Sequence, residues 1–135
     1  LYKFEYDSGK KQFDGTLILK RLMKQAKRKN YFRILGVIDQ DIFFEFYNYN
    51  FGVAKPGGAL ISIFRLKETY YDREENPALF EKRTLTESVH ELGHTFGLDH
   101  CDNDCIMQFS KSLMLVDKKT PNFCDKCIGK LEEAF

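Results

Sequence analysis

The chain has 135 residues, of which 43% are hydrophobic and 30% charged, and its formal net charge is +1. This composition is typical of a globular protein with one core and excludes an intrinsically disordered chain. The near-neutral charge gives no overall attraction to nucleic acid or to an anionic membrane, and no apolar run is long enough to span a bilayer. No secretory signal is visible. We therefore expect one cytoplasmic domain with neither a nucleic-acid nor a membrane partner.

The N-terminal part of the chain predicts one helix after a short strand. Aromatic and charged residues alternate over residues 2–6, which favours a strand, and residues 7–10 favour a turn. Asp14 is a suitable N-cap for a helix over 15–29. The apolar stripe of this helix consists of Ile18, Leu22, Met23 and Ala26. Its lysines and arginines crowd the C-terminal end, where the helix dipole favours them, so we interpret them as a solvated face rather than a phosphate-binding surface.

Three strands are predicted in the stretch that follows. Residues 32–38 indicate a central strand, and residues 59–66 indicate a second buried strand. Between them, residues 48–54 favour an edge strand, followed by a turn at 56–58. Because an edge strand has unpaired backbone groups, an extended peptide can add to it as a further strand. The alternative is an edge shielded by another part of the molecule.

A long helix is predicted over residues 77–96, after a polar loop over 68–75. Asn76 is a suitable N-cap, Pro77 fits the first turn, and Gly97 can take the left-handed conformation that ends a helix. The residues expected to pack on the sheet are Leu85, Val89, Leu92 and Phe96. The opposite flank carries Arg83, Glu87, His90 and His94. One face of this helix is therefore expected to face the core, and the adjoining face to hold a metal.

The metal face belongs to the motif H-E-x-x-H-x-x-G-x-x-H, which spans residues 90–100. Residues four apart lie on one side of a helix, so His90 and His94 can bind the same ion, and the turn after the helix brings His100 to it as a third ligand. Three protein ligands leave one position for water, which is typical of catalytic zinc. Glu91 lies beside this position and is the expected general base. The alternative is a helix whose histidines face solvent.

The cysteines form two pairs, Cys101 with Cys105 and Cys124 with Cys127, separated by 18 residues. Such short spacings favour a structural zinc bound by four thiolates. The alternative is two disulfides, for which four cysteines allow three connectivities, but no secretory context supports them. The C-terminal part is otherwise rich in loops, so a second metal would add stability there. Apolar residues over 128–131 indicate a short terminal helix near the cysteines.

With these motifs and the sequence Cys105-Ile106-Met107, the chain resembles the archaemetzincins. That family joins the metzincin histidine motif directly to a cysteine, followed by C-x-M and a distal C-x-x-C. Further similar stretches are Leu35-Gly36-Val37 with Asp39 and Asp41, Asn50-Phe51-Gly52, Ile61-Ser62 with Arg65-Leu66, and Phe109-Ser110. Two spacings around the cysteines are one residue shorter than in the family pattern. The resemblance covers nearly the whole chain.

The resemblance implies an α/β fold: a compact metzincin-like domain over 1–135, with a twisted mixed sheet, an antiparallel edge strand and an active-site helix in an upper part, 1–97. The lower part, 98–135, would contain the Met-turn and a loop-rich region around a four-cysteine zinc. Two Zn²⁺ per chain are implied. The implied ligands are His90, His94 and His100 for the catalytic zinc and Cys101, Cys105, Cys124 and Cys127 for the structural zinc. Met107 is implied as the Met-turn methionine beneath the histidines, a role compatible with that of an adaptable core residue.

The expected function is therefore a zinc-dependent metallopeptidase that hydrolyses peptide bonds through a zinc-bound water, with Glu91 as general base. Its partner would be a peptide or protein substrate, cleaved by endopeptidase or aminopeptidase action. Tyr70 and Tyr71 are candidate helpers at the oxyanion, or else surface and packing residues. The alternative function is a zinc-stabilised peptide-binding or regulatory module with little turnover. Nucleic-acid binding through the basic helix is disfavoured by the near-neutral charge.

Overall fold

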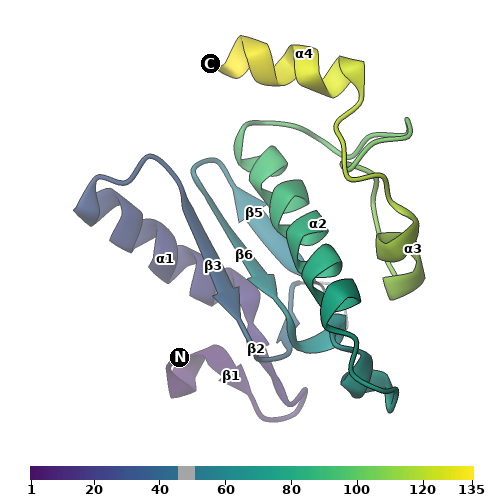
Figure 1. Ribbon diagram of the computed structural model, residues 1–135. Coiled ribbons are helices and arrows are strands. Elements are labelled where there is room, and N and C mark those ends of the chain that lie inside the picture. Colours follow the sequence, from purple (N-terminus) through teal and green to yellow (C-terminus); the bar gives the residue numbers. More distant parts are fainter. Residues whose placement is uncertain (46–50) are drawn as a thin grey trace.

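The computed structural model describes residues 1–45 and 51–135 (Figure 1). Its α-helices are α1 (Gly15–Lys29), α2 (Pro77–Thr95), α3 (Leu113–Lys118) and α4 (Asp125–Ala134). Its strands are β1 (Tyr6–Asp7), β2 (Gln12–Asp14), β3 (Ile34–Ile38), β4 (Ile42–Phe43), β5 (Gly52–Lys55) and β6 (Gly58–Ser62). Short 3-10 turns cover Lys3–Glu5, Phe64–Leu66 and Glu68–Tyr71. The α/β class is as predicted.

The sheet that carries the fold is mixed, and its strand order is β3-β6-β5. β3 is parallel to β6, whereas β5 is antiparallel to it. The predicted antiparallel edge strand is therefore confirmed as β5, although residues 48–50 of that prediction lie outside the described residues. The prediction of a central strand over 32–38 is wrong, because β3 lies at an edge of this sheet among the described strands and β6 occupies the centre.

β6 lies at the centre because it pairs with both β3 and β5, and all five of its residues are buried. Side chains of a strand alternate between the two faces of a sheet, so a strand buried throughout needs cover on both faces. α1 and α2 both pack against β5 and β6, and the sheet lies between them (Figure 1). The strand predicted over 59–66 ends early, at Ser62, because the chain then turns through the 3-10 segment Phe64–Leu66.

The N-terminal strand is shorter than the predicted 2–6, since residues 3–5 form a 3-10 turn and β1 begins at Tyr6. The cause is the buried carboxylate of Glu5. It accepts hydrogen bonds from the backbone N–H of Tyr2 and from the guanidinium of Arg21, and these contacts curl the chain back on itself. β1, β2 and β4 form a small second sheet in the order β1-β2-β4.

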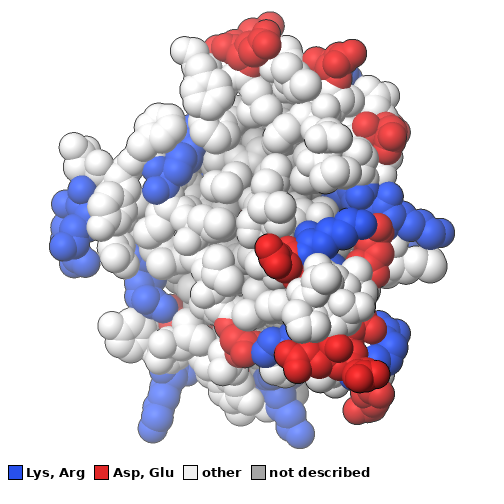
Figure 2. Space-filling model, viewed as in Figure 1, with Lys and Arg blue, Asp and Glu red and all other residues white. Residues whose placement is uncertain are grey.

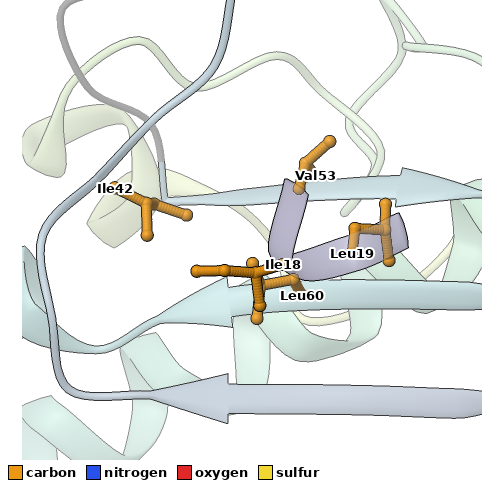
Figure 3. Packing of buried hydrophobic residues seen from close by; sticks show 5 residues of the cluster. All are labelled: Ile18, Leu19, Ile42, Val53 and Leu60. Carbon is orange, nitrogen blue, oxygen red and sulfur yellow. The ribbon is translucent and has the colours of Figure 1, made fainter. Parts of the chain in front are cut away.

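α1 forms where it is predicted and provides one side of the main core. Oδ1 of Asp14 caps it by accepting hydrogen bonds from the N–H groups of Thr16 and Leu17, at 2.9 and 3.3 Å. Figure 3 shows the buried side chains that meet here from α1, β4, β5 and β6, namely Ile18, Leu19, Ile42, Val53 and Leu60. Leu19, which is fully buried, was not part of the predicted apolar stripe.

α2 begins at Pro77 as predicted and ends at Thr95, one residue before the predicted end, but the side predicted to face the core is wrong. Leu85 is 63% exposed, and Val89 packs beside the cysteines. The buried side chains of the helix are mostly polar, namely Arg83, Thr86, Glu87, His90, Glu91 and Thr95. For Arg83, the reason for burial is a tertiary contact: its guanidinium forms a bidentate ion pair with Asp117 of α3, at 2.8 Å for both contacts. α3 itself was not predicted.

The surface carries charges of both signs. Figure 2 shows basic and acidic side chains spread around one face, with no wide area of a single sign. In the described part of the chain, no helix combines the length and the apolar character that crossing a membrane requires. The division of the chain into an upper part, 1–97, and a lower part, 98–135, stays a prediction.

The contact between α1 and β3 generates a stability prediction. A Cβ at Gly36 would lie 2.4 Å from a methyl carbon of Leu22 and 3.1 Å from one of Leu60. Gly36→Ala should therefore lower the free energy of unfolding by about 1–3 kcal/mol through overpacking. The matched control is Gly129→Ala in α4, where a Cβ meets nothing within 4 Å. That change should raise stability by about 0.5–1 kcal/mol. Urea unfolding of both variants checks this, and equal effects would contradict it.

Candidate metal centres

The side chains of His90, His94 and His100 converge on one point. One ring nitrogen from each lies within 4.8 Å of the others. The Nε2 atoms of His90 and His94 are 3.1 Å apart. Two nitrogens bound to one tetrahedral zinc at 2.0–2.1 Å would be separated by roughly 3.3 Å. The three imidazoles therefore fit a single ion of this size and coordination. The alternative of a helix whose histidines face solvent is wrong, because His90 is buried and His94 half-buried.

Backbone carbonyls beyond the helix orient two of these rings. Nδ1 of His90 lies 2.8 Å from the carbonyl oxygen of Ile106, and Nδ1 of His94 lies 2.6 Å from that of Leu98. With a hydrogen on Nδ1, each ring donates to its carbonyl and turns the lone pair of Nε2 toward the common point. The sequence carries no signal for these two acceptors, because they are backbone atoms.

The chain reaches the third histidine by a sharp turn at Gly97, which has a φ of 91°. The N–H of Gly97 donates to the carbonyl of His94, and the N–H of Leu98 donates to that of Gly93. These bonds end α2 and reverse the chain, as predicted from the position of Gly97 after the helix. Another glycine, Gly93, lets the fully buried Met107 lie against the helix, since a Cβ there would be 2.5 Å from the methionine sulfur.

Glu91 lies beside the histidines and is almost fully buried, with 6% exposed. It packs against the edge strand β5, where a Cβ at Gly52 would lie 2.6 Å from Cγ of Glu91 and 2.8–2.9 Å from its carboxyl group. Burial, together with the nearby charge of Glu87, raises the pKa of Glu91 to about 8. A carboxyl group with its pKa so near neutrality is suited to taking up and releasing a proton.

A cavity of about 680 Å³ opens in front of these side chains. All three histidines and Glu91 line it, together with residues 52–55 of β5. Apolar rings of Phe44, Phe51 and Phe109 form further parts of the wall. The predicted edge strand and the predicted metal site therefore share one cleft.

A buried ion pair lies behind His90. Nζ of Lys119, which follows α3, is 3.5 Å from Oε1 of Glu87 and 3.3 Å from Nδ1 of His90. Burial lowers the pKa of Lys119 and raises that of Glu87. Burial and the lysine charge lower the pKa of His90 to about 3, so this imidazole is neutral at ordinary pH and able to bind a metal. Sequence analysis missed Lys119, which stands in a polar run and carries no motif.

The four cysteines form the second centre. The sulfur atoms of Cys101, Cys105, Cys124 and Cys127 all lie within 4.8 Å of one another, and all four are free thiols. The predicted alternative of two disulfides is therefore not what the structure contains. A backbone N–H of Cys127 and the amide of Asn103 lower the pKa of Cys124 to about 6. Four sulfur donors around one point are a donor set that suits zinc.

Other predicted site residues lie elsewhere. The hydroxyl of Tyr71 donates to the carbonyl oxygen of Arg65 at 2.7 Å, and the ring of Tyr70 packs edge-on against Phe64. Neither tyrosine lines the cavity. The interpretation of the two as packing residues is therefore the better one. The terminal helix is confirmed as α4, and Leu131 packs against the cysteines, whereas Ile128 is exposed.

Comparisons with known proteins agree with this geometry. The family described as Peptidase family M54 matches residues 3–133. Two curated relatives named archaemetzincin are those of Pyrococcus abyssi, 40% identical over 98% of this chain and 73% of the relative, and of Methanocaldococcus jannaschii, 39% identical over 98% and 72%.

Solved structures of similar proteins support the same assignment. The archaemetzincin of Methanopyrus kandleri superposes with a TM-score of 0.87 at 35% identity, covering 99% of this chain and 72% of the other. A zinc-dependent peptidase from Methanocorpusculum labreanum superposes with a TM-score of 0.88 at 30% identity, covering 94% and 78%. These matches, on top of the histidine and cysteine clusters, confirm the predicted resemblance, and the chain belongs to peptidase family M54, the family of the archaemetzincins.

Proposed function

We propose that this zinc metallopeptidase binds its catalytic zinc through His90, His94 and His100 and uses Glu91 as general base. The observation that carries the proposal is the convergence of the three ring nitrogens within 4.8 Å at the wall of a cavity that Glu91 also lines. Three ligands on the protein side leave the cavity side for water and substrate. The second proposed zinc is structural, bound by Cys101, Cys105, Cys124 and Cys127.

When bound, zinc polarises a peptide carbonyl and makes water more acidic. The chain's own residues supply the rest. The carbonyls of Ile106 and Leu98 hold two imidazoles in the metal-binding orientation. The carboxylate of Glu91 takes a proton from the attacking water and delivers it to the leaving amine nitrogen. Met107, buried under the helix beside Gly93, supports the histidines from below in the manner of a Met-turn.

The substrate is a peptide or protein, and we propose that it binds in an extended form along β5. Among the described strands β5 lies at the sheet edge, is antiparallel to β6 and lines the cavity with residues 52–55. Backbone groups on such an edge can pair with a further strand. Because four clustered cysteines that form no disulfide suit a reducing compartment, we also propose that the protein acts in the cytoplasm.

Glu91→Gln tests the proposed base. The variant keeps the shape of the side chain but loses the ability to take up a proton. We expect kcat/KM to fall by about 10²–10⁴-fold, with zinc content unchanged. Fluorogenic peptides, blocked and unblocked at the N-terminus, provide the assay and separate endopeptidase from aminopeptidase action. Glu81→Gln, on the exposed side of α2, is the matched control and should retain activity. Turnover by Glu91→Gln equal to that of the parent would rule out this role.

The same variant should change how the stability of the metal-free protein depends on pH. The folded-state pKa of Glu91, about 8, lies above its ordinary value of 4.5. Between these values the folded protein holds a proton that the unfolded chain has released, so this group reduces stability as pH rises. Glu91→Gln removes the effect. We expect its Tm to exceed that of the parent by about 5 °C more at pH 8 than at pH 5. An equal Tm difference at both values would contradict the pKa.

Metal content tests the two proposed sites. We expect two zinc ions per chain, measured by elemental analysis, and one after mild chelation. His100→Ala should lose the ion that the chelator removes and keep the other, because its four cysteines are intact. A parent protein with a single zinc, unaffected by His100→Ala, would favour the alternative of a zinc-stabilised binding module over the peptidase mechanism.

A further inference from the structure

We propose that the cysteine site controls the metal affinity of the histidine site through the segment Cys105–Met107. Filling the cysteine site would hold this segment in place, and the segment in turn would hold the histidines ready for their ion. The inference rests on the proposed function, because it takes both metal sites as assigned there.

Each residue of the segment contacts one site or joins the two. The sulfur of Cys105 belongs to the cysteine cluster and accepts hydrogen bonds from the backbone N–H groups of Met107 and Cys124, at 3.5 and 3.3 Å. The carbonyl of Ile106 faces Nδ1 of His90 at 2.8 Å. The carbonyl of Met107 accepts a hydrogen bond from the N–H of Cys101 at 3.0 Å.

The two sites are also joined along the chain and through the core. His100, the proposed third ligand of the first site, is followed directly by Cys101, a proposed ligand of the second. One buried cluster includes members of both neighbourhoods, namely Leu98, Cys105, Ile106, Met107 and Cys127. A shift of any one of these residues must therefore displace groups at both sites, since a packed interior does not deform smoothly.

The loop that carries these contacts has little structure of its own. Residues 96–112 form neither helix nor strand. A few backbone hydrogen bonds, such as those from Cys101 to Met107 and from Ile106 to Asn122, join the loop to its neighbours, and four metal–thiolate bonds would be the strongest further restraint on its position. Metal binding at such a site includes the ordering of its loop, so the loop is ordered at no further cost when the second ion binds. By linkage the effect is reciprocal: each ion raises the affinity of the other by the same factor.

The size of the effect follows from the role of the Ile106 carbonyl. Groups that orient a metal-binding imidazole typically change metal affinity by about 10–100-fold. We expect the histidine site to bind its ion roughly tenfold more weakly, or worse, when the cysteine site is unable to bind one.

Co²⁺ titration of the metal-free protein measures the two sites separately. Thiolate ligands give intense charge-transfer bands, whereas imidazole ligands give only weak ligand-field bands. Cys127→Ser removes one sulfur in α4, and we expect it to weaken Co²⁺ binding at the histidines about tenfold. Cys127→His, which retains four ligands of a kind that zinc sites use, should restore most of the loss. Leu131→Ala is the matched control, because it weakens packing of the same helix against the cluster and removes no ligand.

The reciprocal measurement uses His94→Asn, which leaves all four cysteines in place. We expect Zn²⁺ to displace Co²⁺ from the thiolates of His94→Asn about tenfold faster than from those of the parent, whose histidine site stays filled, and this holds whether or not Cys127→Ser folds. Two results would overturn the inference: equally fast displacement of Co²⁺ from the thiolates in His94→Asn and in the parent, or an effect of Leu131→Ala as large as that of Cys127→Ser. Both leave the proposed function intact. A parent protein whose histidines bind no Co²⁺ would instead overturn the proposed function itself, and the inference with it.

Discussion

The structure depends on two hydrogen bonds that cross from a helix to the loop after it, from His90 to the carbonyl of Ile106 and from His94 to that of Leu98. The histidines supply the nitrogens that we propose bind zinc, but a free imidazole rotates and changes tautomer. The two carbonyls remove that freedom, because a ring that donates through Nδ1 must present the lone pair of Nε2. The loop is therefore as much a part of the histidine site as the helix is.

The same arrangement has a cost in stability. α2 buries Arg83, Glu87 and Glu91 where an ordinary helix would bury apolar side chains. Burial of an ion pair such as Glu87–Lys119 contributes little or nothing to stability once the loss of hydration is counted. Burial disfavours the charged form of a side chain, and it therefore raises the pKa of Glu91 and lowers that of His90. The fold thus buries charged side chains around the proposed site that would be more stable in water. Metal ions bound at the two sites would help to offset this loss of hydration.

Family membership accounts for the fold, whereas local geometry accounts for how the cysteine site tolerates a change in spacing. The comparisons assign the chain to a peptidase family, and its fold is that of a solved archaemetzincin and a solved zinc-dependent peptidase. The shorter spacings around the cysteines nevertheless leave the four sulfur atoms within 4.8 Å. A tetrahedral site fixes the positions of the four sulfur atoms but not the length of the loops between the cysteines. Loss of one residue from such a loop is therefore tolerated.

What the sequence by itself determined is local. The caps at Asp14 and Asn76, the turn at Gly97 and the spacing of the histidines act over a few residues, and each is where it was predicted. The tertiary structure decided which side of α2 is buried, which strand is central, and which lysine stands behind His90. Those outcomes depend on residues far apart in the chain, as with Lys119 and His90, 29 positions apart. No periodicity records such a contact, because it exists only once the sheet, α2 and α3 have packed together.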